Sequence, residues 1–445
     1  MPPAPVRLEF ADDLFARRHR GLGSPVVNQW VWRLEKPYDA ARVKAVAEGL
    51  ARGGLSRRLH RAVVPGARDI WTNAGEPPVA DLGCDPIPAG ELSAWLKARH
   101  LEHLDPEEGL TWRLAATDLD DGTGVVSLIL AHAVGDGGSV LDSVMRAATG
   151  ADPLELPPLP STLPGRLVED AKDAAGQFAA IGRWVGARIR AQRAGAAAPG
   201  ARKRGPAPTA EAPATTDSSW EAARLTVELE TGAIADVAAR HGGSSNSWFV
   251  AVMARLLVTI GHVPEDGGPV PVSLPMSEFR PGDTRSNSTR VTRVEVPREA
   301  LADRDLAVVK ALCKEAYTRL ATAGTGFVPV PLALIQMLPD AVVKQLPTPP
   351  SASCMASNLG NLPDDYVHAF GPDVRSITGM ASYQQASAAE VRAMGGGLIA
   401  WLVNSGRRTT FTIIGAEPDR IADTAALTAL VTDELGSCGL DAEPW

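Results

Sequence analysis

The stretch LILAHAVGDGGSVLDSV, residues 128–144, joins an apolar run to a helix through a corner that contains three glycines. Residues 125–130 are mostly β-branched or aliphatic, a pattern that predicts a buried strand with His132 just beyond its end. The glycines permit a tight reversal that larger residues would obstruct. Ser139 is then expected to cap a helix, because apolar residues recur at helical spacing over residues 140–145.

The composition limits the class of protein. The chain has 445 residues, which favours two domains, and its net charge of -8 argues against nucleic-acid binding. The N-terminus lacks the basic and apolar segments of a secretory signal. The cysteines are far apart and form no CxxC pair, so we expect free thiols and a cytoplasmic protein; they are Cys84, Cys313, Cys354 and Cys438.

Three regions follow from the distribution of helix and strand patterns. Residues 1–150 mix both patterns and include an expected β-hairpin over residues 110–134, whose second strand leads to His132. Residues 151–216 change to proline-rich and alanine-rich segments on either side of one long helical pattern, which is typical of a crossover linker. Residues 217–445 mix helices and strands again. We therefore expect an α+β protein of two halves.

Two of the expected helices have apolar surfaces that must be buried in the folded protein. Residues 248–263 are apolar but contain Arg255 and are too short to span a membrane, so we expect a buried helix there. The crossover helix carries an apolar stripe that we expect to pack against both halves, which leaves no reason for membrane contact. The stripe consists of Leu167, Ala171, Ala174, Phe178, Ile181, Val185 and Ile189.

The segment HAVGDG, residues 132–137, resembles the HxxxDG motif of the chloramphenicol-acetyltransferase-like acyltransferase superfamily, which includes condensation domains and wax ester synthase/diacylglycerol acyltransferases. Further segments follow in the order of the wax ester synthase branch: LTW at 110–112, SSNSWFVAVMARLL at 244–257, VPVSLPMSEFR at 270–280 with the subsequent Asn287, and ASNLGNLP at 356–363. The sequence departs from that branch at Ala131, where many relatives have a first histidine. It also departs at Ser247, which replaces an aspartate after Asn246.

The resemblance implies a fold and an activity. Two chloramphenicol-acetyltransferase-like halves would form a V-shaped pseudo-dimer with a central channel. An acyl group would move from a thioester on coenzyme A or a carrier protein to an alcohol or amine, in secondary or lipid metabolism. Coenzyme A or phosphopantetheine would be a co-substrate, and neither a permanently bound cofactor nor a metal is expected.

The resemblance also assigns roles to residues. His132 would be the general base, since a neutral imidazole can take a proton near neutral pH. Asp136 would orient the loop, with Arg58 as its expected partner, and Gly137 would permit the turn. Oxyanion or substrate-binding donors would come from the second half of the chain; the candidates are Ser357, Asn358 and Asn287.

Two alternatives to this activity stay open. One is a stand-alone condensation enzyme that forms an amide between carrier-bound substrates, and the other is a catalytically silent binding or scaffold protein of the same fold. His100 and His103 could be read as metal ligands, but no third ligand lies near them in the sequence, so we expect a solvated helix end there.

Overall fold

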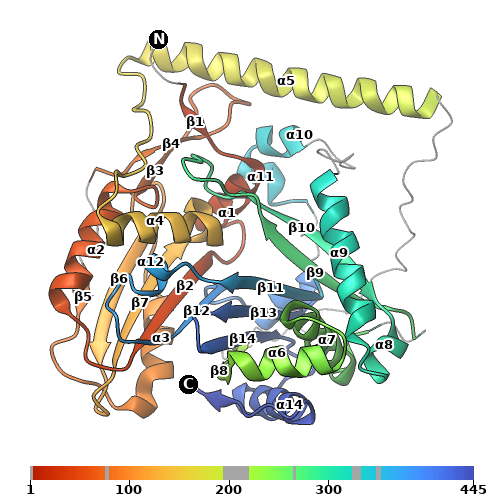
Figure 1. Cartoon of the computed structure of the whole chain (residues 1–445). Helices are drawn as coiled ribbons and strands as arrows, with labels where there is room; N and C mark the ends of the chain where they lie inside the picture. Colours follow the sequence, from red (N-terminus) through yellow and green to blue (C-terminus); the bar gives the residue numbers. More distant parts are fainter. Residues whose placement is uncertain (1–3, 76–79, 194–219, 264–266, 323–331, 347–351) are drawn as a thin grey trace.

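The computed structural model describes residues 4–75, 80–193, 220–263, 267–322, 332–346 and 352–445. They form two lobes, each a mixed sheet flanked by helices (Figure 1). This architecture confirms the predicted α+β fold of two halves.

Within the described residues, the first lobe is built on a five-stranded sheet with the strand order β12, β2, β7, β6, β5. Its strands are β2 (Val26–Leu34), β5 (Asp81–Leu82), β6 (Trp112–Asp118), β7 (Gly124–Ala131) and β12 (Val374–Tyr383). β6 and β7 pair antiparallel, which confirms the predicted hairpin, and every residue of β7 is buried as expected. A small sheet of β1 (Val6–Arg7), β4 (Ile70–Asn73) and β3 (Arg57–His60) lies beside it.

The second lobe is built on a sheet of seven described strands with the order β10, β9, β11, β13, β14, β8, β15. The strands are β8 (Ala223–Glu230), β9 (Val270–Ser277), β10 (Thr289–Val296), β11 (Cys354–Asn361), β13 (Gly397–Asn404), β14 (Arg408–Ala416) and β15 (Glu443–Pro444). β11 pairs parallel with β9 and β13, whereas the other neighbours pair antiparallel.

The described helices pack on the sheets or connect them, except that α5 runs along the outside of the molecule (Figure 1). They are α1 (Phe10–His19), α2 (Ala40–Arg52), α3 (Leu92–His100), α4 (Gly137–Thr149), α5 (Leu163–Arg193), α6 (Thr231–Arg240), α7 (Ser245–Thr259), α8 (Arg298–Ala302), α9 (Leu306–Thr322), α10 (Leu332–Met337), α11 (Asp340–Val343), α12 (Asp364–Val367), α13 (Ala388–Met394) and α14 (Thr424–Ser437). In the first lobe, Val43, Val46 and Leu50 of α2 are fully buried in the core.

The predicted buried helix is α7, whose apolar side chains lie in the core of the second lobe. Arg255, the charged residue within it, forms an ion pair with Glu434 of α14 at 2.5 Å, which satisfies the cation without membrane contact. None of the described helices is long and apolar enough to cross a membrane. The four cysteines are free thiols, as predicted.

The crossover helix α5 runs along the outside of the molecule, and its predicted burial is wrong (Figure 1). Phe178 is 63% exposed, and Leu167, Val185 and Ile189 of the same stripe are also exposed. The helix docks by a different face, because the buried carboxylate of Asp170 pairs with Arg7 at 2.7 Å and accepts the amide N–H of Val63.

The crossover therefore contacts the body chiefly through acidic side chains, and of its apolar stripe only Ala174 is buried. Asp173 adds to this contact by pairing with Arg68 at 2.9 Å. The absence of membrane contact stays a prediction, since the argument from burial of the stripe no longer supports it. The linker prediction for residues 151–216 lies partly outside the described residues.

One strand of the first lobe comes from the C-terminal part of the sequence. β12 belongs to the C-terminal part of the sequence but pairs antiparallel with β2 in the sheet of the first lobe. The sheet of the first lobe thus contains strands from both predicted halves, residues 1–150 and 217–445. That these two halves are separate domains stays a prediction. β12 also contacts the second sheet, where Thr410 donates its hydroxyl to the carbonyl oxygen of Ile377 at 2.7 Å.

A buried carboxylate joins the same strand to the second lobe. Glu228 of β8 is fully buried and accepts hydrogen bonds from Arg375 at 2.9 Å and from the hydroxyl of Ser376 at 2.6 Å, both in β12. Arg33 of β2 donates to the same carboxylate at 3.3 Å. Each lobe therefore depends on the other to balance buried charge at this contact.

Glu228→Ala is expected to destabilise the protein by about 3 kcal/mol or more, because it leaves Arg33 and Arg375 without their shared buried counter-ion. Thermal denaturation measures the effect. Glu230→Ala removes an exposed carboxylate of the same strand that pairs with Arg408, and is the control, with an expected change below about 1 kcal/mol. Equal melting of the two variants would contradict this account of the lobe contact.

Candidate functional site

A cavity of about 1420 Å³ lies between the lobes. Much of its wall is apolar, with contributions from Leu14, Trp30, Phe279, Met355, Ile399 and Trp401. The structure brings six of the predicted site residues to this one cavity: His132, Asp136, Gly137, Ser357, Asn358 and Asn287. A mainly apolar pocket with a few converging polar groups is the usual form of a small-molecule site.

His132 lies in a single 3-10 turn, His132–Val134, directly after β7. Its ring stacks on Phe15 of α1, with ring centroids 4.0 Å apart and 20° between the planes. Its Nδ1 atom lies 3.1 Å from Oδ1 of Asn287, which belongs to the loop between β9 and β10. The imidazole is therefore held by both lobes, and none of the described residues forms a hydrogen bond with its Nε2 atom.

The orientation of the Asn287 amide follows from its other contacts. Its Nδ2 atom donates to Oδ1 of Asp12 at 2.9 Å and to the carbonyl oxygen of His132 at 2.9 Å. A flipped amide would point its oxygen at these two acceptors, so the orientation given is the favourable one. Oδ1 of Asn287 must then accept a hydrogen bond from Nδ1–H of His132. This tautomer leaves a lone pair on Nε2.

The charge state of His132 suits a proton acceptor. Burial lowers the pKa of its imidazole below the ordinary value of 6.5, although its own carbonyl, Asp136 and Asn287 oppose the shift. The ring is therefore neutral at pH 7. A neutral imidazole with Nδ1 protonated and Nε2 free can take a proton from a ligand in the cavity.

Asp12 is a site residue that sequence reasoning missed. It lies on the buried face of α1, three residues before Phe15, and accepts both the backbone N–H and the side-chain Nδ2–H of Asn287. Burial raises the pKa of its carboxyl from 3.8 to about 7, and the Asn287 hydrogen bond, a backbone N–H and the charge of Arg57 oppose the rise. No local signal in the sequence points to this role, because Asn287 lies 275 residues away.

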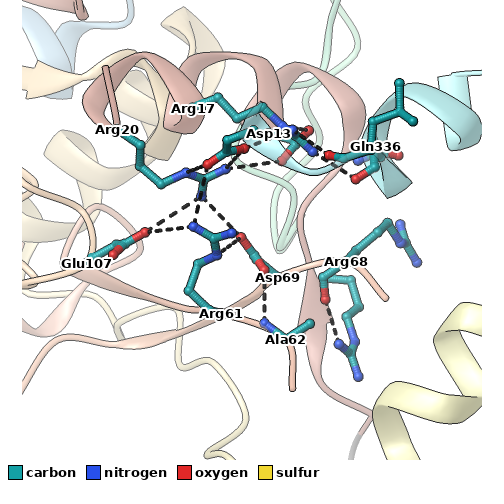
Figure 2. Close-up of polar contacts among 12 residues, drawn as sticks. Asp13, Arg17, Arg20, Arg61, Ala62, Arg68, Asp69, Glu107 and Gln336 are labelled. Atoms are coloured by element: carbon teal, nitrogen blue, oxygen red, sulfur yellow. Dashed lines mark hydrogen bonds and ion pairs between the residues drawn. The ribbon is translucent and has the colours of Figure 1, made fainter. Parts of the chain in front are cut away.

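Ion pairs hold α1 in place (Figure 2). Arg17 pairs with Asp13 at 2.7 Å and donates to the carbonyl oxygens of Gln336 and Leu338. One turn further on, Arg20 pairs with Asp69 at 3.2 Å. These contacts fix the helix that carries Asp12 and Phe15, and they lie outside the cavity.

Asp136 has the predicted orienting position but a different set of partners. One oxygen accepts the backbone N–H of Ser139 at 3.1 Å, which makes Asp136 the N-cap of α4 in place of the predicted Ser139. The other oxygen accepts the backbone N–H of Ser288 at 2.7 Å and the hydroxyl of Thr289 at 2.8 Å. Asp136 therefore joins the HxxxDG corner to the segment that contains Asn287.

The predicted partnership between Asp136 and Arg58 is wrong. Arg58 is exposed and donates to the carbonyl oxygen of Glu107. Successive residues of a strand point to opposite faces, so its neighbour Arg57 in β3 is the buried one. Arg57 donates to the hydroxyl of Ser286 at 3.0 Å and to a carbonyl of the same loop.

The glycines of the corner serve close packing. The φ angle of Gly137 is not positive, so the turn at this position does not require the conformational freedom of glycine. A side chain at Gly137 would press on Leu359 of β11 at 3.3 Å. At Gly138 an added Cβ would lie 2.5 Å from Phe279 and 2.6 Å from the Ser277 hydroxyl, so only glycine fits there.

The three predicted oxyanion candidates differ in what they offer. Asn287 uses both of its side-chain groups to hold His132 and Asp12, so it is a positioning residue. Asn358 donates to Oδ1 of Asn246 at 3.0 Å, which brings two of the motif segments together. No described residue accepts a hydrogen bond from the Ser357 hydroxyl, so Ser357 is the donor best placed to meet a ligand.

The two histidines of the α3 end have separate environments. His100 is buried rather than solvated, with Nε2 at 3.0 Å from the Ser382 hydroxyl, and burial lowers its pKa to about 3. His103 is exposed, and its ring lies within 4.8 Å of carboxylate oxygens of Asp105 and Glu108, so further possible ligands do lie near it, contrary to the expectation from the sequence. Asp105 already accepts the backbone N–H of Glu108, so it has a structural role in that loop.

No protein-family model matches the sequence, and no curated protein matches it. Solved structures match over nearly the whole chain. The first condensation domain of the CDA synthetase is 15% identical with a TM-score of 0.58, over 98% of this chain and 97% of that one. The condensation domain of the Monacolin K polyketide synthase MokA is 12% identical with a TM-score of 0.57, over 98% and 96%.

The wax ester synthase/diacylglycerol acyltransferase from Marinobacter aquaeolei VT8 is 14% identical with a TM-score of 0.54, over 98% of this chain and 100% of that one. The chain has the fold of condensation domains and wax ester synthases. The fold implied by the HxxxDG resemblance is therefore confirmed. At such low identity the likeness shows the fold alone, and the roles of His132, Asp136 and Ser357 stay predictions.

The raised pKa of Asp12 predicts a pH-dependent stability. Between the unfolded value of 3.8 and about 7 the folded state binds the Asp12 proton more tightly, so stability falls as pH rises through this window. Asp12→Asn removes the titrating group. The free energy of unfolding of the wild type relative to this variant should drop by on the order of 2 kcal/mol between about pH 5 and pH 8.

Denaturant unfolding at a series of pH values measures this difference. Glu108→Gln, which neutralises an exposed acid, should leave the pH dependence of the wild type unchanged. Parallel curves for the wild type and Asp12→Asn would show that Asp12 is not held with a raised pKa.

Proposed function

We propose that this protein is an acyltransferase that moves an acyl group from a thioester to an alcohol or amine, with His132 as the general base. The observation that carries the proposal is the neutral His132 imidazole, with Nδ1–H bonded to Asn287 and Nε2 bonded to no described residue within a large, mainly apolar cavity. An apolar wall suits an acyl chain, and the free nitrogen suits a proton transfer.

In the proposed reaction, the acceptor hydroxyl or amine enters the cavity beside Nε2 of His132. As its oxygen or nitrogen attacks the thioester carbonyl, its proton passes to Nε2. The imidazolium is stabilised by Asn287 and by the charge of Asp136, and the hydroxyl of Ser357 donates to the oxyanion. Collapse of the intermediate breaks the carbon–sulfur bond, and Nε2 returns the proton to the thiolate.

The thioester in this proposal is carried by coenzyme A or by the phosphopantetheine of a carrier protein, and it is a co-substrate rather than a resident cofactor. The reaction requires no metal. We propose that the protein acts in the cytoplasm, where such thioesters are made.

A second candidate is amide formation between two carrier-bound substrates. The full-length likeness to condensation domains favours it, since these domains share the fold. The same His132 chemistry would serve an amine acceptor. The two candidates differ only in the acceptor and in whether a carrier protein must dock.

Intact-mass spectrometry and product analysis with panels of acyl thioesters and acceptors test the proposal. His132→Ala should lower turnover by about 100-fold or more, because a positioned general base contributes roughly 10² to 10⁴. It should stay folded by circular dichroism.

His103→Ala changes an exposed histidine outside the cavity and should keep wild-type turnover. A folded His132→Ala protein with near wild-type turnover would exclude the base role. Absence of acyl transfer across the panel, with wild-type binding of the same thioesters, would favour the silent binding protein.

A further inference from the structure

The cavity reaches a basic side chain on the second sheet. In β8, Ala223, Leu225 and Val227 are buried in the core of the second lobe. Because side chains alternate along a strand, Arg224 and Thr226 lie on the opposite face, and both line the cavity. Arg224 is thus directed at the same cavity that His132 lines.

The strand register shows which side chains form the cavity wall between β11 and Arg224 of β8. Met355 of β11 pairs with Ile399 of β13, Ile399 with Ile414 of β14, and Ile414 with Arg224 of β8. All four side chains line the cavity. Three strand intervals of about 4.8 Å place β8 about 14 Å from β11.

The β11 end of this row is the reactive end. A Cβ at Gly137, beside Asp136, would contact Leu359 of β11 at 3.3 Å. Ser357, the proposed oxyanion donor, also lies in β11 and lines the cavity. An apolar wall of Met355, Ile399 and Ile414 therefore separates the chemistry of His132 from the cation of Arg224.

The guanidinium of Arg224 has no hydrogen-bonded or ion-paired partner within the part of the chain that the structure describes, although Glu221 is close enough for its charge to raise the pKa of Arg224. Glu228, four residues further along the same face, has three side-chain partners. Glu221, the nearest acid in the sequence, pairs with Lys97 at 2.6 Å. Burial lowers the pKa of Arg224 to about 10, so the guanidinium is still charged at neutral pH.

Its surroundings supply no other free cation among the described residues. His100 is close enough to Arg224 to feel its charge, but burial keeps this imidazole neutral. Lys97 is engaged by Glu221. A partly desolvated cation without a partner is costly, and a ligand anion would offset that cost.

We propose that Arg224 binds the carboxylate of a substrate whose reactive group lies at His132, with an apolar chain along Met355, Ile399 and Ile414 between them. A single guanidinium fork matches one carboxylate in a bidentate pair. The charge of Glu221 reaches Arg224 and repels a phosphate dianion more strongly than a carboxylate monoanion. The placement of the substrate's reactive group at His132 rests on the proposed acyl transfer. Binding of a carboxylate by Arg224 does not depend on that function.

Isothermal titration calorimetry with dodecanoate, methyl dodecanoate and dodecyl phosphate tests the proposal without turnover. The wild type should bind dodecanoate at least about tenfold more tightly than the methyl ester, as expected for a charge-assisted pair. Arg224→Gln should bind the two compounds equally and should melt no earlier than the wild type. Arg58→Gln removes an exposed cation outside the cavity and should keep the preference.

Equal binding of dodecanoate and its methyl ester by the wild type would overturn the proposal, as would a preference that persists in Arg224→Gln. Tighter binding of dodecyl phosphate than of dodecanoate would overturn the choice of carboxylate. His132→Ala should retain the preference. Loss of turnover in His132→Ala without any carboxylate preference in the wild type would reject the Arg224 site and leave acyl transfer supported.

Discussion

The site depends on one segment of the second lobe, residues 286–289, whose first three residues are buried and which inserts between two carboxylates of the first lobe. Asp12 accepts both N–H groups of Asn287, and Asp136 accepts from Ser288 and Thr289. The carbonyl oxygen of Ser286 in turn accepts the backbone N–H of Asp136. The two lobes are therefore joined at the residues that also fix the imidazole.

This arrangement separates orientation from reaction. Asn287 holds Nδ1 of His132, Phe15 fixes the ring plane, and the ion pairs of α1 fix Asp12 and Phe15. The cost of a preorganised buried site is seen in the raised pKa of Asp12. What stays available to a ligand is the Nε2 atom, the Ser357 hydroxyl and an apolar wall that ends at Arg224.

The sequence predicted correctly those helices and strands whose formation depends on neighbouring residues. The β6–β7 hairpin and α7 follow from apolar runs of fixed period, and His132 and Asn287 were found because each belongs to a motif segment. Asp12 was missed because its partner Asn287 lies 275 residues away, and no short-range signal encodes that contact. Arg58 was chosen over Arg57 because strand alternation leaves open which of two neighbours is buried until the sheet is placed.

The α5 stripe shows a second limit. Helical periodicity identified an apolar face correctly, yet the helix docks through Asp170 and Asp173, because cations and free amide groups of the first lobe meet it there. Arg224 could not be singled out either, because its lack of a partner is a property of the whole assembled cavity. Sequence patterns thus predicted which elements form, but not which charged groups would meet.

The most direct test of the account is the tautomer of His132, measured by long-range ¹H–¹⁵N correlation spectra of histidine-labelled protein near pH 7.5, with the signal assigned by its loss in His132→Ala. The hydrogen bonds of Asn287 predict a neutral ring protonated at Nδ1 and unprotonated at Nε2. A ring protonated at Nε2, or an even mixture of the two tautomers, would contradict the claim that Asp12 and Asn287 prepare His132 to accept a proton.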